Sequence, residues 1–299
     1  MSYRAENYPH TGPSAWLDRP DALDRIDQKL AAGKLTDDEA AHCRHWSEQG
    51  YVILSGLIQE AVLSDVWASY DQAIGAGKIK LPPEAAADDD PHPGRYLNPH
   101  KKAGDFCRIL KHVELTRWIR LLMEREPRPL QTIASHKGSQ QGVHSDSIHM
   151  TTYPLGYLTA AWIAFEDIHP DSGPLVYYPG SHKLPYVFSK EVGITEKAFR
   201  EEGYGPYHAR YEPYIRGLIE RHGLQPKHFH AKTGDVLIWH ANLLHGGSAR
   251  RDMRLTRKAL VCHFYTKGVF VYHDLASSRS RQQYLGTCLL RDREGKRLL

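Results

Sequence analysis

The stretch that decides the fold is Gly142-Val143-His144-Ser145-Asp146. A second segment with a candidate metal ligand follows about a hundred residues later, Leu244-His245-Gly246-Gly247-Ser248. A His and an Asp two positions apart on an extended chain project to the same face, because strand side chains alternate with a period of two. Two such side chains cover one edge of a metal ion. A third ligand, returned from a distant strand, completes one face of the ion and leaves three positions open.

The candidate ligands His144, Asp146 and His245 form a 2-His-1-carboxylate set. Non-haem Fe(II) oxygenases use this donor set. A His-x-Asp triplet by itself is weak evidence, because the chain contains 19 histidines. His240 lies close enough to His245 to compete for the third position, but the Gly-Gly-Ser that follows His245 favours His245.

Composition narrows the function classes. The chain has 299 residues, of which 41% are hydrophobic and 25% charged, as is usual for a soluble globular enzyme. The net charge of +4 is small and the basic residues are scattered, which argues against nucleic acid as a partner. No apolar run has membrane-spanning length, and the N-terminus lacks the apolar segment of a signal peptide. Four cysteines without CxxC spacing indicate neither a zinc cluster nor a disulfide framework, so we expect a cytoplasmic protein. The oligomeric state stays open.

The N-terminal half alternates helical and extended patterns. Residues 1–34 are expected to form an N-terminal extension with a short helix. Thr36 and Glu39 form a capping box that begins the next helix, and Gly50 ends it. Pro127 and Pro129 are expected to break the last helix of this half. The expected helices are residues 21–30, 36–49, 58–74 and 106–123, with a strand at 51–54.

After Leu130 the pattern changes to short runs rich in β-branched and aromatic residues, separated by Gly, Pro and Asp. Such runs predict an all-β sandwich or barrel. We expect a mainly β domain with flanking helices, built as a double-stranded β-helix (a cupin-like jelly roll), over residues 35–275. Residues 75–105 and 188–229 are interpreted as lid-like insertions, and 276–299 as a C-terminal tail. The expected strands are 131–135, 158–168, 175–178, 236–239 and 258–265.

Arg257 is the strongest candidate for an anion clamp. On a strand over 258–265, Arg257 shares a face with Ala259, Val261 and His263. A buried guanidinium beside small side chains calls for a bidentate carboxylate, which either a ligand or a structural ion pair supplies. The neighbouring Arg250 and Arg251 lie in a polar turn and are expected to face solvent, whereas the direction of Arg254 depends on where the strand begins.

Several motifs together give the chain a resemblance to the phytanoyl-CoA dioxygenase family. The resemblance covers roughly residues 35–270 and includes the Gly50-Tyr51-Val52-Ile53-Leu54 unit near its start. The motifs are His144-Ser145-Asp146, Ala161-Trp162-Ile163-Ala164-Phe165-Glu166-Asp167-Ile168, Gly173-Pro174-Leu175-Val176-Tyr177-Tyr178-Pro179-Gly180-Ser181-His182-Lys183, Gly234-Asp235, and His245 followed by Arg257-Lys258-Ala259-Leu260-Val261-Cys262-His263-Phe264.

The resemblance implies a double-stranded β-helix that binds Fe(II) and 2-oxoglutarate. His144, Asp146 and His245 would be the iron ligands, and Arg257 would hold the distal carboxylate of 2-oxoglutarate. Trp162 resembles a family aromatic that lines the cofactor pocket, although a core aromatic is an equal alternative. Family members often place one Gly between the distal His and a cofactor-contacting Ser. Here two glycines precede Ser248, so either Ser248 or the Gly247 backbone takes that contact.

The activity implied by the resemblance is an O2-dependent oxidation of an unactivated C–H bond, with release of succinate and CO2 from 2-oxoglutarate. Related halogenases lack the carboxylate ligand, so the presence of Asp146 favours hydroxylation. The family acts on many small molecules, and the sequence does not identify which one this chain takes. A jelly-roll binding protein with a non-catalytic or zinc-filled site is the alternative.

Overall fold

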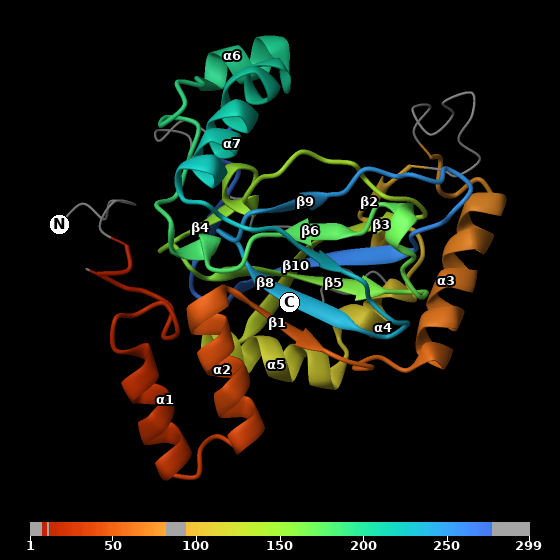
Figure 1. The fold of residues 1–299 in the computed structure, drawn as a ribbon. Helices are drawn as coiled ribbons and strands as arrows, with labels where there is room; N and C mark the ends of the chain where they lie inside the picture. The colour runs from red at the N-terminus through yellow and green to blue at the C-terminus, as the bar shows by residue number, and fades with distance from the viewer. Residues whose placement is uncertain (1–7, 11, 82–93, 277–299) are drawn as a thin grey trace.

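A computed structural model describes residues 8–10, 12–81 and 94–276. Two antiparallel layers form its centre (Figure 1). The main sheet has the order β1 (Tyr51–Leu54), β8 (Val236–His240), β5 (Leu158–Ala164), β10 (Ala259–Thr266), β3 (Pro127–Ser135) and β2 (Tyr96–Leu97). The second layer contains β7 (Lys227–Phe229), β6 (Leu175–Tyr177) and β9 (His245–Gly247), with the pair β11 (Phe270–Tyr272) and β4 (Thr151–Tyr153) beside it.

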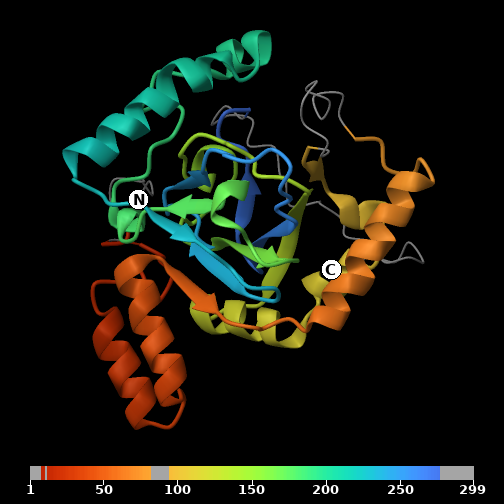
Figure 2. The ribbon, with the colours of Figure 1, turned by 45° about the vertical axis from the view of Figure 1, so that its right-hand side comes forward.

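Helices flank this centre on two sides, and Figure 2 shows the two groups well apart. The first group covers the main sheet and consists of α1 (Ala22–Ala31), α2 (Asp37–Gln49), α3 (Glu60–Gly75), α4 (Phe106–Leu110) and α5 (Val113–Met123). The second group, α6 (Glu196–Glu202) and α7 (Glu212–Arg221), belongs to the 188–229 insertion. No helix in the described ranges has the length and apolarity to cross a membrane.

The central strands of the main sheet are buried on both faces. Ile163, Ile238 and Leu260 pack against the helices, while their neighbours Trp162 and Trp239 point to the interior between the sheets. Such strands are nearly continuous in apolar residues, as expected for a sheet covered on both sides. The alternation therefore assigns one face to the helical core and the other to the cavity.

The first helix boundaries follow the sequence signals. Thr36 Oγ1 accepts a hydrogen bond from the Glu39 N–H (3.2 Å), and the Glu39 carboxylate accepts one from the Thr36 N–H (3.0 Å). Gly50 ends α2 with φ at 81°, where a Cβ would meet the ring of His182 at 2.4 Å. The expected capping box and glycine stop are thus confirmed.

The segment expected as an N-terminal extension contributes to the main core. Trp16, Leu17 and Ile26 lie in the same buried cluster as Trp46 and Trp67. Trp16 also donates a hydrogen bond from Nε1 to the carbonyl of Leu121 at 3.0 Å. Trp16, Leu17 and Ile26 therefore pack with the helices that cover the main sheet.

Three expectations for residues 75–135 are corrected. The loop at 75–105 contains β2 and the 3₁₀ turn η3 (Pro99–Lys101), while its residues 82–93 fall outside the described ranges. The helix expected at 106–123 is two helices, because the His112 side chain caps a new start by accepting from the Leu115 N–H. The second helix ends at Met123, before the prolines, as expected, but the strand expected at 131–135 already begins at Pro127, so β3 contains Pro127 and Pro129. The register of β3 against β10 shifts there, and a bulge accommodates a residue that donates no ladder hydrogen bond.

Candidate functional site

The two candidate histidine ligands are held opposite one another by their backbones. The His144 N–H donates to the His245 carbonyl, and the His245 N–H donates to the His144 carbonyl, each at 2.9 Å. His245 opens β9, whereas His144 lies outside the named strands and forms an isolated bridge with it. This reciprocal pair brings the ring centroids to 4.5 Å.

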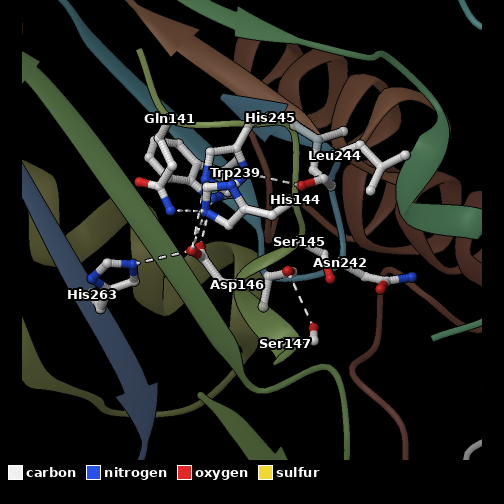
Figure 3. A network of polar contacts seen from close by, with 12 residues as sticks. Gln141, His144, Ser145, Asp146, Ser147, Trp239, Asn242, Leu244, His245 and His263 are labelled. Carbon is white, nitrogen blue, oxygen red and sulfur yellow. Dashed lines mark hydrogen bonds and ion pairs between the residues drawn. The ribbon is translucent and has the colours of Figure 1, made fainter. Parts of the chain in front are cut away.

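In both histidines, a hydrogen bond from Nδ1 to the backbone carbonyl two residues earlier orients the ring. Nδ1 of His144 lies 2.9 Å from the Gly142 carbonyl, and Nδ1 of His245 lies 2.9 Å from the Leu243 carbonyl. A carbonyl accepts only, so each Nδ1 carries a proton, and in the neutral form of either ring Nε2 is the nitrogen that keeps its lone pair. The Nε2 atoms lie 4.0 and 3.6 Å from Asp146 Oδ1, and both point toward it in Figure 3.

Asp146 begins the 3₁₀ turn η4 (Asp146–Ile148), one residue after the extended Ser145. The extended residue places Asp146 on the same side as His144, as the triplet predicts. Trp239 Nε1 donates to Asp146 Oδ2 at 2.8 Å, which leaves Oδ1 facing the imidazoles. The indole therefore fixes which oxygen is available as a ligand.

The protonation states suit metal binding. Burial lowers the pKa of His144 well below its ordinary value, with help from His245 and His149, so the ring is neutral. Burial alone would raise the pKa of Asp146, but His245, His263 and His144 outweigh it and hold the pKa below its usual range. A neutral imidazole and an ionised carboxylate are the forms that ligate a cation.

Together, His144, Asp146 and His245 form a group whose ligand atoms lie within 4.8 Å of one another, and all three side chains are buried. We call this group the metal triad. Its donor set has the geometry for a single ion held on one face. The structure thus brings together the three residues that the sequence nominated.

His240, the rival for the third position, is engaged elsewhere. Its Nε2 lies 3.1 Å from Asp18 Oδ2, and its Nδ1 accepts from the Asn242 N–H at 3.0 Å. Neither nitrogen is left for a metal. Of the two candidates, His245 alone belongs to the metal triad.

A cavity opens above the metal triad between the two sheets. It encloses about 600 Å³ when the open space at its mouth is included. The inward face of β10 lines it in the expected alternation. The lining residues are Arg95, Ile133, Ser135, Ser139, Gln141, His144, Asp146, Trp162, Leu175, Trp239, His245, Gly246, Arg257, Ala259, Val261 and His263.

Arg257 lies in this cavity as a buried cation, 4% exposed. Its Nη1 donates to the Gly173 carbonyl at 2.9 Å, while its Nε is buried without a hydrogen-bond partner. The Trp162 ring lies beside it, 5.7 Å from Cζ. Burial, with Arg250 and Arg95, lowers the pKa of Arg257 to about 10, so it stays charged at neutral pH. No described carboxylate pairs with it, which disfavours the structural ion pair.

The neighbouring arginines do not enter the cavity. Arg254 forms a bidentate pair with Asp252 on the surface, and Arg251 is exposed. Arg250 was expected to face solvent, and this is wrong: it is 7% exposed and donates to the Met253 carbonyl at 2.8 Å. Its stem is buried because the turn folds back over Gly173.

The double glycine after His245 has a steric origin. A Cβ on Gly246 would lie 2.8 Å from the Gln141 carbonyl oxygen, and one on Gly247 would lie 2.5 Å from Ser139 Oγ. β9 therefore passes against residues 139–143 at a distance that admits no side chain. Gly246 lines the cavity, whereas Ser248 stands outside the lining set and its Oγ is buried without a partner.

Three residues near the metal triad were not nominated from the sequence. Trp239 and His263 lie on the inward faces of β8 and β10, so strand alternation offered a signal for both. His263 Nε2 lies 3.4 Å from Asp146 Oδ1. Gln141 Nε2 lies 3.3 Å from His144 Nε2, and no sequence pattern marked it.

Comparison with known proteins places this site in a family. The sequence profile of the family described as Phytanoyl-CoA dioxygenase (PhyH) matches residues 46–259, most of the chain. That range contains the metal triad and Arg257.

Curated relatives match over shorter segments. A probable phytanoyl-CoA dioxygenase of Caenorhabditis elegans is 31% identical over 130 residues, covering 42% of this chain and 36% of that protein. The peroxisomal phytanoyl-CoA dioxygenase of Mus musculus is 30% identical over 132 residues, covering 43% and 34%. An ectoine dioxygenase of Halomonas elongata is 28% identical over 156 residues, covering 48% and 45%. The match thus spans about a third to a half of these relatives' length.

Solved structures share the fold at low identity. EctD from S. alaskensis, crystallised with 2-oxoglutarate and 5-hydroxyectoine, has a TM-score of 0.62 at 16% identity and covers 84% of this chain and 83% of its own. The non-heme alpha ketoglutarate dependent carbocyclase SnoK has a TM-score of 0.58 at 15% identity, covering 87% and 89%. The expected jelly roll with flanking helices is confirmed.

Proposed function

The chain belongs to the phytanoyl-CoA dioxygenase family, and on that premise we propose that it is a non-haem Fe(II)- and 2-oxoglutarate-dependent dioxygenase. It hydroxylates an unactivated C–H bond of a small-molecule substrate and releases succinate and CO2. One observation carries the proposal: a buried metal triad and a buried Arg257 without a carboxylate partner line the same cavity.

The metal triad fits Fe(II). Two imidazoles and one carboxylate are the donors this ion takes in oxygenases, with positions left for a co-substrate and O2. Bound Fe(II) and 2-oxoglutarate supply the oxidising chemistry, in which O2 is consumed and 2-oxoglutarate is decarboxylated. The protein holds the ligands: the Gly142 and Leu243 carbonyls set the two tautomers, and Trp239 turns the carboxylate.

Arg257 fits the distal carboxylate of 2-oxoglutarate. The guanidinium is charged, buried and lacks a partner at Nε, so a carboxylate in the cavity would complete its hydrogen bonding. Trp162 covers the guanidinium and would border the bound co-substrate. Ser248 Oγ, also buried without a partner, and the Gly247 backbone stay alternatives for a further cofactor contact.

Apolar side chains form part of the cavity wall. Leu175, Ala259 and Val261 are apolar, and the main sheet seals the floor. A water-poor cavity strengthens the pairing between Arg257 and a carboxylate and limits side reactions of the oxidant. Selection of the C–H bond then depends on how the substrate is oriented at the cavity mouth.

The alternative is a jelly-roll binding protein whose triad is empty of function or filled with zinc. Both functions predict metal binding, so metal content alone does not separate them. Turnover does: the dioxygenase converts 2-oxoglutarate to succinate with O2, and a zinc-filled binding protein does not.

The test is a substrate screen on protein reconstituted with Fe(II) under nitrogen. O2 consumption and succinate are measured after 2-oxoglutarate and air are added, with Zn(II)-loaded protein as the control. We expect one Fe(II) per chain and succinate formation, slow without substrate and faster with a productive one. Iron-loaded protein that never forms succinate would favour the binding protein.

A further inference from the structure

The cavity carries one positive charge more than the proposed function uses. Its lining holds two guanidinium groups, Arg95 and Arg257, and a single carboxylate, Asp146. The charge of Fe(II) and of Arg257 is balanced by Asp146 and the two carboxylates of 2-oxoglutarate. Arg95 is then left without a counter-charge within the described part of the chain.

Arg95 is held near the metal triad through one side chain. Its Nη1 donates to Gln141 Oε1 at 2.6 Å, and Gln141 Nε2 lies 3.3 Å from His144 Nε2. The residue after it, Tyr96, pairs with Ala134 of the main sheet, so the backbone at Arg95 is anchored. An anion bound by Arg95 would therefore lie one side chain away from the metal.

A cluster of aromatic rings, which we call the aromatic wall, continues from the metal triad on this side. His149 lies at its base, with its ring centroid 5.4 Å from that of His144. Around it, centroids lie 5.7 Å away for Tyr204, 5.1 Å for Tyr207 and 6.3 Å for His273. The wall consists of His149, Phe199, Tyr204, Tyr207 and His273.

Three distant segments of the chain build this wall: the turn after Asp146, the 188–229 insertion, and the residue that follows β11. Tyr207 belongs to a π-helix, η7 (Tyr207–Tyr211), and such turns occur frequently at functional sites. The second helical group, set against the second layer in Figure 1, thus brings its rings beside the triad.

Three buried polar atoms of the aromatic wall have no hydrogen-bond partner. Both ring nitrogens of His149 and the hydroxyl of Tyr207 are buried without a hydrogen bond. Tyr204 keeps 45% of its surface exposed. Burial raises the pKa of Tyr204 and the charge of Arg95 opposes it, so the wall and Arg95 lie within electrostatic reach.

From these observations we propose that the substrate is a small ring-bearing anion. Its carboxylate or phosphate pairs with the guanidinium of Arg95, and its ring packs on the aromatic wall, which places its C–H bonds beside the metal triad. This inference rests on the proposed function and specifies the substrate class of the same site.

Binding of three matched probes tests the charge preference: phenylacetate, phenyl phosphate and the neutral 2-phenylethanol. Calorimetric titrations are run under nitrogen on protein loaded with Fe(II) and saturated with 2-oxoglutarate. We expect at least one anionic probe to bind about tenfold or more tightly than the alcohol, and the stronger of the two identifies the anionic group. Equal binding of all three would overturn the inference.

Variants of Arg95 test whether its guanidinium causes the tighter binding of the anionic probes. Arg95→Gln should remove the advantage of the anionic probes while leaving the alcohol unchanged, and Arg95→Lys should keep part of it. Arg216→Gln, an exposed arginine on α7, is the matched control and should change nothing. Wild-type preference in Arg95→Gln would refute the assignment.

The aromatic wall has its own test. Tyr204→Ala should weaken all three probes by a similar factor of about five, and Tyr204→Phe should not. Tyr214→Ala on α7 is the control. Iron content and succinate formation of wild-type protein report the proposed function separately. Normal succinate with no anion preference would overturn the substrate class alone, whereas absence of succinate would overturn the dioxygenase.

Discussion

Two buried clusters in this protein combine an aspartate with two histidines, and they differ in which nitrogens are free. In the metal triad, Nδ1 of His144 and of His245 donates to a carbonyl, and each Nε2 faces Asp146. In the second cluster, which we call the Asp18 cluster (Asp18, Tyr8, His182 and His240), Nε2 of His240 is taken by Asp18. Both aspartate side chains are 6% exposed.

The difference lies in the backbone group that Nδ1 meets. A carbonyl acceptor fixes the proton on Nδ1 and leaves Nε2 as a donor of electrons to a metal. The Asn242 N–H does the reverse at His240, since it requires an unprotonated Nδ1 and so places the proton on Nε2, toward Asp18. The first arrangement makes a ligand set, and the second ties the N-terminal segment to the end of β8.

The largest expected effect is the difference in iron content between a variant of the metal triad and a variant of the Asp18 cluster. Asp146→Ala removes the single anionic ligand, so iron and succinate formation should both be lost while the fold persists. Asp18→Ala should retain one iron per chain. Iron analysis and succinate assay after anaerobic reconstitution measure this. The assignment is wrong if Asp146→Ala keeps both its iron and its turnover.

The free energy of unfolding of the metal-free protein should fall in Asp18→Ala, the variant that keeps its iron. Asp18→Ala leaves the buried His240 without the carboxylate that faces its Nε2, and loss of one member of a buried pair costs about 3 kcal/mol. Urea unfolding of the metal-free protein measures the loss. An unchanged free energy of unfolding would show that the Asp18 cluster contributes nothing to the fold.

The same carboxyl gives a pH dependence. Burial alone raises the pKa of Asp18, but the charge and hydrogen bond of His240, with the hydrogen bond of Tyr8, outweigh it and hold the pKa below its ordinary value. A depressed carboxyl stabilises the fold fully above its unfolded pKa and loses that contribution as the pH falls through the folded value. The stability lead of wild type over Asp18→Ala should therefore shrink below about pH 4.

The next largest effect is expected for Arg257, the proposed carboxylate clamp for 2-oxoglutarate. Arg257→Ala removes a buried charge-assisted pair worth about 2–5 kcal/mol, so the 2-oxoglutarate requirement should rise roughly thirtyfold or more. Arg257→Lys should restore part of it, because a point charge does not copy the fork. Iron binding should change little. Arg254→Ala, whose arginine pairs with Asp252 on the surface, is the control, and a larger defect there would move the clamp to Arg254.

The smallest effect concerns the carboxylate orientation. Trp239→Phe keeps the packing of the ring but removes the hydrogen bond to Asp146 Oδ2. Partners of this kind are worth about tenfold or more in metal affinity, so Fe(II) should bind about tenfold more weakly. A competition titration with a chelator reads this out. Unchanged affinity would mean that packing alone orients Asp146.

Strand alternation and helix-capping signals predicted much of the fold around the site from the sequence. The period-two alternation predicted which side chains of β10 face the cavity, and it held for Arg257 through His263. The capping box and Gly50 predicted both ends of α2. Local rules failed at the start of β3, which begins at Pro127 instead of the expected residue 131, and at Arg250, which is buried because its turn folds back over Gly173.

The sequence by itself determined the donor set, the inward face of β10 and the family, because these depend on residue identity and on periodicities shorter than one element. Tertiary structure alone decided that both ring nitrogens of His240 are occupied by other partners, that Trp239 turns Asp146, and that Arg95 lines the cavity above the metal triad. The physical reason is the range of the interactions. Each of these choices depends on a hydrogen bond or ring contact between segments far apart in the chain, and no local pattern encodes which distant backbone group a side chain will meet.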